Sequence, residues 1–128
     1  MKTGALWLND AAWIGSVRVA SSFFQRLRGL LGCRGLGSGC GLLIESCSAV
    51  HTVGMRFALD LIFIDAQWRI VACVRGVRPG RWCVPGGLRA RRVVEVESGW
   101  LDLTQVPVGA HLRWVDAQES DAGSDGLR

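Results

Sequence analysis

The apolar run Leu59–Ile64, LDLIFI, constrains the fold more than any other part of this sequence. Apart from Asp60, its side chains are hydrophobic at odd and even positions alike, whereas a strand with one face in water alternates apolar and polar residues. The run therefore predicts a central strand that is buried on both faces. Residues 65–68 are expected to form a turn after it, and residues 69–74 to return beside it as the second strand of a hairpin.

Most of the remaining chain has the pattern of short strands, with one well-marked helix. Strands are expected at residues 16–20, 41–44, 92–96 and 112–115, with a glycine- and proline-rich loop at residues 78–87. The helix is expected at residues 22–32, where Ser22 and Gln25 form a capping box and Gly32 can end the last turn. One or two helical turns are expected within residues 98–105. This pattern predicts a mainly β (β-rich α+β) fold, a small β-sandwich or partly closed barrel with one short N-terminal helix.

A chain of 128 residues fits one domain. Residues 1–115 are expected to form a single globular domain, and the polar, acidic residues 116–128 a disordered tail. No apolar run approaches the ~18 residues of a membrane-spanning helix. The N-terminus has only short apolar pieces, interrupted by Asn9 and Asp10, and it lacks the long hydrophobic region of a secretory signal. We therefore expect a cytoplasmic protein.

The five cysteines agree with this expectation. Their number is odd and they form no C-x-x-C pair, so the sequence indicates neither a disulfide framework nor a common zinc-binding spacing. Cys33, Cys40 and Cys47 follow one another at intervals of seven, which also fails to match the usual spacing of zinc ligands. We interpret the cysteines as small buried or half-buried thiols, and we expect no metal or other cofactor.

Positive charge is concentrated ahead of the C-terminal tail. The net charge is +4, but residues 116–128 hold four acids and one arginine, which leaves residues 1–115 with 14 bases and 7 acids, a net of +7. Residues 66–94 contain seven arginines and no acid. Such a segment can attract phosphates, acidic partners or anionic surfaces, although an arginine-rich composition also gives a solvated basic face without any function. Trp68 and Trp82 lie within the segment, so nucleic-acid binding by charge and stacking is an alternative, but no nucleic-acid motif accompanies it.

Three soft ligands precede the central strand in the order Cys47, His51 and Met55. This order is similar to that of the ligand loop of blue-copper proteins, but the second imidazole would have to come from His111, on a late strand. Alternatively, Cys47 is a nucleophile and His51 is its base, since residues four apart can meet across a turn or across one helical turn. Asp60 is the carboxylate that could orient the imidazole in that arrangement.

A structural interpretation of the same segment rests on Asp60. A carboxylate within a buried strand needs hydrogen-bond partners, because an unpaired buried charge is costly. On this view Gly54 supplies a backbone angle that other residues adopt only at a cost, and Met55 and Phe57 belong to the core. We expect the donors to Asp60 to come from the preceding loop: the backbone amides of residues 51–55, the Thr52 hydroxyl, His51 or Arg56.

The same loop could form one wall of a shallow pocket for an anionic ligand, with Trp82 or Trp100 as an apolar face. Glu95 and Glu97 lie on one face of the strand expected at residues 92–96. Paired carboxylates can serve acid–base chemistry, but the outward polar face of an edge strand is the simpler interpretation of this pair. The candidate ligand-binding residues are His51, Thr52, Arg56, Asp60, Arg89 and Arg91.

Most of the sequence resembles a known family. In chain order, the matching segments between residues 26 and 114 are RLRGLLG, GLLIE, HTVGMRFALDLIFID, RIVACV, VVEVESG and VPVGAHLRW. They resemble the family catalogued as domain of unknown function 192. The resemblance implies a mainly β sandwich or barrel with little helix, and it implies no established activity. The chain departs from the common pattern at Ala58, where proline is usual, and at residues 67–68, where a turn of the Asp-Gly type is usual.

These observations favour a binding module for an anionic small ligand or a protein partner over an enzyme. The alternative is a hydrolase-like or transfer enzyme centred on Cys47 and His51, and the second alternative is nucleic-acid binding through residues 66–94. One branch of the family that the chain resembles has tryptophan in place of His51 and threonine in place of Met55, so a role that needs both an imidazole and a thioether cannot extend to the whole family. Asp60 is the position that both branches share.

Overall fold

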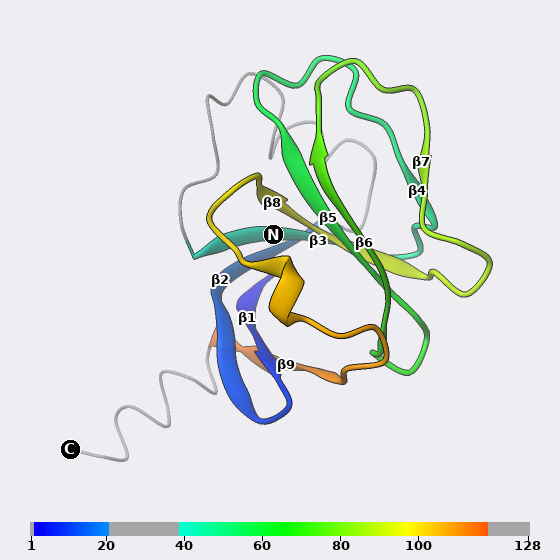
Figure 1. Cartoon of the computed structure of the whole chain (residues 1–128). Coiled ribbons are helices and arrows are strands. Elements are labelled where there is room, and N and C mark those ends of the chain that lie inside the picture. The colour runs from blue at the N-terminus through cyan, green and yellow to red at the C-terminus, as the bar shows by residue number, and fades with distance from the viewer. Residues whose placement is uncertain (1, 21–38, 118–128) are drawn as a thin grey trace.

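A curved seven-stranded sheet dominates the structure, a computed structural model that describes residues 2–20 and 39–117 (Figure 1). In the order β6-β5-β8-β3-β2-β1-β9, every neighbouring pair is antiparallel except β2 and β3. β4 and β7 form a separate two-stranded sheet. The elements are β1 (Lys2–Leu8), β2 (Ala11–Ala20), β3 (Cys40–Ile44), β4 (Ala49–Val50), β5 (Leu59–Ile64), β6 (Ile70–Val77), β7 (Val84–Pro85), β8 (Arg92–Glu97), the 3-10 helix η1 (Leu103–Gln105) and β9 (Leu112–Asp116).

The central strand predicted from the sequence is β5. It lies between β6 and β8, and all six of its residues are buried. Leu59, Leu61 and Phe63 face one apolar cluster, which we call the first core, together with Met55 and Phe57. The alternate side chains of β5 face a second core on the other side of the sheet. Successive side chains of β5 point to opposite faces of the sheet. Because both faces are covered, its residues are apolar at odd and at even positions.

The second core lies where the sheet curves round on itself. Ile62 and Ile64 of β5 and Val94 and Val96 of β8 contribute to it, together with Leu112 of β9, at the far edge of the sheet. Ile64 and its neighbours therefore pack against strands from both halves of the sheet. Burial of this apolar surface, at roughly 25 cal/mol per Å², is the main favourable term that holds the two halves together.

The two edges of the sheet meet at one end only. Arg69 and His111 form an isolated antiparallel bridge, and the Leu112 N–H donates to the Trp68 carbonyl oxygen at 2.7 Å. Across the described residues, this pairing does not continue into a ladder between β6 and β9. The sheet is therefore not closed into a barrel, and the expected mainly β fold is confirmed as an open, curved sheet beside the two-stranded sheet.

Several expected elements differ in extent from those observed. Lys2–Leu8 forms β1, a strand that the sequence pattern did not predict, and β2 begins at Ala11. Residues 98–105 contain only the three-residue η1, and the loop at residues 78–87 contains the short β7. The helix expected at residues 22–32, Cys33 and most of the expected tail lie outside the described residues. Within the described ranges, no helix has the length and hydrophobicity needed to cross a membrane.

Candidate functional site

Two adjoining depressions lie where β5 ends and β8 begins. One has a volume of about 420 Å³ and is lined by residues 45–48, 66 and 90–92. The other has a volume of about 390 Å³ and is lined by residues 65–67, 69, 88, 89 and 91. Ala66 and Arg91 line both depressions, so the two form one continuous surface. We call this surface, residues 45–48, 65–67, 69 and 88–92, the arginine groove.

Asp65 fixes the turn that forms one side of the arginine groove. Its Oδ1 accepts the backbone N–H groups of Gln67 at 2.9 Å and Arg69 at 2.8 Å, and its Oδ2 lies 3.5 Å from Arg69 Nε. These contacts allow Trp68 to adopt a φ of 63°, in a left-handed region that non-glycine residues seldom occupy. Burial alone would raise the pKa of the Asp65 carboxyl, but the two N–H bonds and the charges of Arg69 and Arg89 outweigh burial and lower the pKa.

Arg92 makes three contacts and joins the segment after β3 to the β5–β6 turn. Its Nε donates to Glu45 Oε2 at 3.1 Å, and its Nη1 donates to the Asp65 carbonyl oxygen at 2.9 Å. Its guanidinium carbon lies 4.2 Å from the centre of the Trp68 ring, a distance typical of a cation–π contact. The charges of Glu45 and Arg92 therefore neutralise one another, and Arg92 acts as part of the scaffold.

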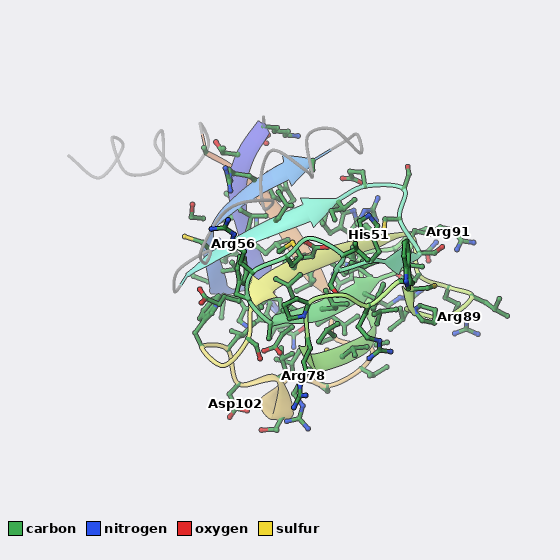
Figure 2. All side chains as sticks on the ribbon, turned by 90° about the horizontal axis from the view of Figure 1, so that it is seen from above. His51, Arg56, Arg78, Arg89, Arg91 and Asp102 are labelled. Carbon is green, nitrogen blue, oxygen red and sulfur yellow. The ribbon has the colours of Figure 1, made fainter. Side chains whose placement is uncertain are left out.

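Arg69, Arg89 and Arg91 are exposed cations of the arginine groove, and Figure 2 shows Arg89 and Arg91 together at one end of the molecule. The Nη1 of Arg91 donates to the carbonyl oxygens of Leu88 at 2.9 Å and Ala90 at 3.0 Å, so part of its guanidinium is held in place by its own loop. Arg89 has no hydrogen bond or ion pair with the residues that the structure describes. With Arg69 and Arg92 against Asp65 and Glu45, the groove carries four positive and two negative charges, a net of +2.

Four of the predicted ligand-binding residues lie outside the arginine groove: His51, Thr52, Arg56 and Asp60. Thr52 is fully buried, and its Oγ1 donates to the Arg78 carbonyl oxygen at 2.7 Å and accepts the Arg81 N–H at 2.8 Å, so it holds the loop at residues 78–81. His51 is half-buried. Arg56 is exposed on the side of the molecule away from Arg89 and Arg91 (Figure 2). The structure therefore joins Arg89 and Arg91 with Cys47, and not with the other predicted ligand-binding residues.

Asp60 is buried, with 3% of its surface exposed, and its hydrogen-bond donors are not the expected ones. Its Oδ1 accepts the Gly76 N–H at 2.8 Å, and its Oδ2 accepts the Gly99 N–H at 3.4 Å. The expected donors from residues 51–56 are therefore replaced by backbone amides of β6 and of the turn after β8. The other features of that interpretation are confirmed, because Gly54 has a φ of 87° and Met55 and Phe57 are buried.

Cys47 lines the arginine groove, and the segment that joins it to His51 is not a helical turn. Its Sγ donates to the Ala49 carbonyl oxygen at 3.0 Å. The short strand β4 lies between Cys47 and His51. His111 lies elsewhere, with its Nε2 2.9 Å from the Gln67 carbonyl oxygen. Among residues 2–20 and 39–117, no three His, Cys, Asp or Glu side chains are grouped as a metal ion would require.

Sequence reasoning misplaced one residue of interest and missed two others. Glu95 is fully buried in β8, between Leu42 of β3 and Leu61 of β5, so its expected place on the outward face of an edge strand is wrong. Arg69 and Glu45 were not singled out as groove residues. The predicted strands could nevertheless have indicated both positions, because Glu45 follows the end of β3 and Arg69 follows the β5–β6 turn.

The comparisons with known proteins agree with this fold and assign no activity. A UPF0127 protein of Thermococcus sibiricus is 29% identical over 86% of this chain and 73% of its own length. A UPF0127 protein of Pyrococcus horikoshii is 29% identical over 82% of this chain and 92% of its own length.

Two solved structures share the fold. A protein of unknown function from Novosphingobium aromaticivorans has a TM-score of 0.71 and 16% identity, covering 88% of this chain and 85% of that one. A protein from Sinorhizobium meliloti, described as a candidate transcription regulator, has a TM-score of 0.69 and 19% identity, covering 88% of this chain and 92% of that one. Residues 7–114 match the family DUF192, described as "Uncharacterized ACR", and since this match spans most of the chain, the protein belongs to that family.

Proposed function

We propose that this protein is a binding module for a small anionic ligand, held in the arginine groove by Arg69, Arg89 and Arg91. The observation that supports this function is that three arginines, from the β5–β6 turn and the loop before β8, line one depression. The two acids of the groove are already occupied, Asp65 by the turn and Glu45 by Arg92. An incoming phosphate or carboxylate would therefore meet an excess of positive charge.

The partial immobilisation of Arg91 supports the same function. Because its Nη1 is already bonded to Leu88 and Ala90, less side-chain entropy is lost when the remaining N–H groups of Arg91 bind a ligand. The planar guanidinium presents paired donors that match the spacing of two oxygen atoms in a carboxylate or phosphate. Leu88 is 97% exposed beside these donors and would contact an apolar part of the same ligand.

The spread of the other arginines favours a small anion over a nucleic acid. A phosphate backbone is followed by a continuous basic surface, but Arg75 lines a different depression and Arg78 lies apart from Arg89 and Arg91 in Figure 2. The Sinorhizobium neighbour is described as a candidate transcription regulator, and at 19% identity that likeness concerns the fold alone. We therefore propose the small anion as the ligand.

Calorimetric titration with inorganic phosphate at low ionic strength tests this proposal. We expect Arg89→Gln to weaken binding by about fivefold, since one lost charge contact at an exposed site is worth roughly 1 kcal/mol. The matched control is Arg78→Gln, which removes the same charge from an exposed position outside the groove. We expect this control to bind phosphate as the wild type does. If both variants lose affinity equally, the effect is one of net charge and the groove is not the site.

A further inference from the structure

A second depression lies at the other end of strands β5 and β8, away from the arginine groove. It has a volume of about 860 Å³ and lies between the β5–β6 hairpin and residues 98–103. β5 begins next to this depression and ends next to the groove, and β8 runs in the opposite direction. At about 3.3 Å per residue, the five-residue step from Asp60 to Asp65 separates the two surfaces by roughly 15 Å. The depression is therefore a site of its own.

A β-bulge brings two opposite charges to this depression. Where the β5–β6 ladder shifts register, β5 contributes Asp60 alone and β6 contributes both Arg75 and Gly76. All three residues line the depression. Gly76 has a φ of 63°, a conformation that glycine adopts without steric cost. Such a bulge leaves one residue out of the ladder and redirects the side chains around it.

The two charges do not neutralise each other. An ionised carboxylate offers about four lone-pair positions, and Asp60 uses two of them for the N–H groups of Gly76 and Gly99. In the described part of the chain, no cation lies within ion-pair distance of Asp60, and Arg75 is exposed and has no ion pair or hydrogen bond. The other acid of the depression, Asp102, caps η1 by accepting hydrogen bonds from the N–H and Oγ1 of Thr104.

Both charges act on the interior of the depression, as the half-buried Cys73 shows. Burial raises the pKa of the Cys73 thiol, the negative charge of Asp60 raises it further, and the positive charge of Arg75 acts in the opposite direction. The thiol is therefore neutral at neutral pH. A ligand in this space would meet a carboxylate and a guanidinium together.

Apolar side chains form the rest of the wall. Val74, Trp100, Leu101 and Leu103 line the depression. Trp100 is half-buried, and its indole N–H is buried and has no acceptor among the described residues. A buried donor without an acceptor is costly, and an aromatic ring at the wall of a pocket provides a flat apolar surface for a ligand.

We propose that this depression binds a zwitterionic α-amino acid with an apolar side chain. The ammonium group would face the remaining acceptor positions of Asp60, the carboxylate would face the Arg75 guanidinium, and the side chain would lie against Trp100 and Leu101. A simple cation would be repelled by Arg75, and a simple anion would be repelled by Asp60. A molecule that carries both charges on neighbouring groups is complementary to both.

Three probes of matched shape test this site: L-leucine, L-leucinamide, which lacks the carboxylate, and N-acetyl-L-leucine, which lacks the ammonium group. Binding is followed in the full-length ¹⁵N-labelled protein by the indole N–H resonance of Trp100, assigned by its absence in Trp100→Phe. We expect L-leucine to shift this resonance at about fivefold lower concentration than either other probe. The indole resonance of Trp68 reports separately on the arginine groove, so a probe that shifts Trp68 and not Trp100 has bound in the groove and not in this depression.

Two variants separate the two charges. Arg75→Gln, at an exposed position, should make L-leucine and L-leucinamide equivalent, and Asp60→Asn should make L-leucine and N-acetyl-L-leucine equivalent. If Asp60→Asn does not fold, Arg75→Gln still decides the matter. The proposal is overturned if none of the probes shifts the Trp100 resonance, or if leucinamide equals leucine in the wild type. Phosphate binding in the arginine groove is unaffected by either result.

Discussion

Asp60 joins three segments of the chain through a single carboxylate. It belongs to β5 and accepts N–H groups from Gly76 in β6 and from Gly99 in the turn after β8. In Asp60→Asn, the amide oxygen can still accept the Gly76 N–H. The Gly99 N–H then faces the amide N–H₂ group or a weaker acceptor, and neither bond retains the negative charge of the carboxylate. We expect the free energy of unfolding to fall by about 1–2 kcal/mol, measured by urea denaturation.

The matched control is Asp102→Asn. Asp102 is exposed and caps η1 through Thr104, and asparagine is an equally good cap, so we expect a change of no more than about 0.5 kcal/mol. An unchanged stability in Asp60→Asn would mean that the two glycine amides are satisfied without it.

Asp65 gives the protein a component of stability that depends on pH. Its pKa is lower in the folded state than the usual value near 4, so its contribution is complete above about pH 4 and is lost as the pH falls through the folded-state pKa. We therefore expect Asp65→Asn to be less stable than the wild type at pH 7, with a difference that shrinks toward pH 3. Urea denaturation at several pH values checks this, and a constant difference across that range would contradict it.

The sequence predicts that Asp60 has partners, but it does not identify them. A buried carboxylate within an apolar strand requires donors, and this requirement can be deduced from LDLIFI alone. The donors here are backbone amides of two glycines, which have no side chain to mark their role. Only the register of the β5–β6 bulge brings Gly76 to Asp60, and one-residue shifts of register are not visible in an apolar pattern.

Among the connecting elements, the loop at residues 78–87, which we call the β7 arm, packs tightly against β5. A Cβ added at Gly86 would overlap the ring of Phe63, which is fully buried in the first core. Gly86→Ala therefore has to move a core aromatic ring, and we expect a loss of about 2–3 kcal/mol in the free energy of unfolding. Thermal or urea denaturation measures this loss.

Gly87→Ala is the control for Gly86→Ala. Gly87 has a φ of 98°, but a Cβ at this position would meet open space. Its replacement should cost only the backbone strain, about 1 kcal/mol. If Gly87→Ala proves the more damaging of the two, backbone conformation and not packing determines the stability of this arm.

The strands were predictable where their apolar pattern is uninterrupted, and β5 is the clearest case. β1 was missed because Gly4 and the polar pair Asn9 and Asp10 resemble breaks in the pattern. In the structure Trp114 packs against Gly4, where a Cβ would collide with its ring, so the missing side chain makes room for the neighbouring strand. Asn9 and Asp10, with φ of 48° and 66°, form the tight turn between β1 and β2.

The arginine groove was predictable from the sequence only in part. Arg89 and Arg91 stood out by charge, and both lie in the groove. Which other residues join them depends on how the β5–β6 turn and the end of β3 lie relative to each other, and this follows from strand order. The order β5-β8-β3 places Glu45 beside Arg92, and no local pattern in the sequence specifies that order.

For the molecule as a whole, β1 connects the edge strand β9 to the rest of the seven-stranded sheet. β1 lies between β2 and β9, so it supplies the pairing partner of the edge strand β9. Removal of residues 1–8 leaves β9 without a partner and exposes part of the second core, which contains Leu6. We expect this truncated protein to lose its cooperative thermal transition, monitored by circular dichroism. A native melting temperature would show that β9 does not depend on β1.

Removal of residues 118–128 is the companion experiment at the other terminus. The sequence predicts that these residues are a disordered tail, so their removal should leave the melting temperature unchanged. A lower melting temperature would instead assign them to the folded domain.

The pairing of β1 with β9 has a consequence for folding during synthesis on the ribosome. During synthesis, Lys2–Leu8 cannot complete its hydrogen bonds until Leu112–Asp116 has emerged, because the two strands pair with each other. Until then, the outer edge of the nascent β1–β2 hairpin is an open template for other strands. Complete pairing of this sheet therefore has to wait for β9, and until then the exposed strand edge favours aggregation over folding.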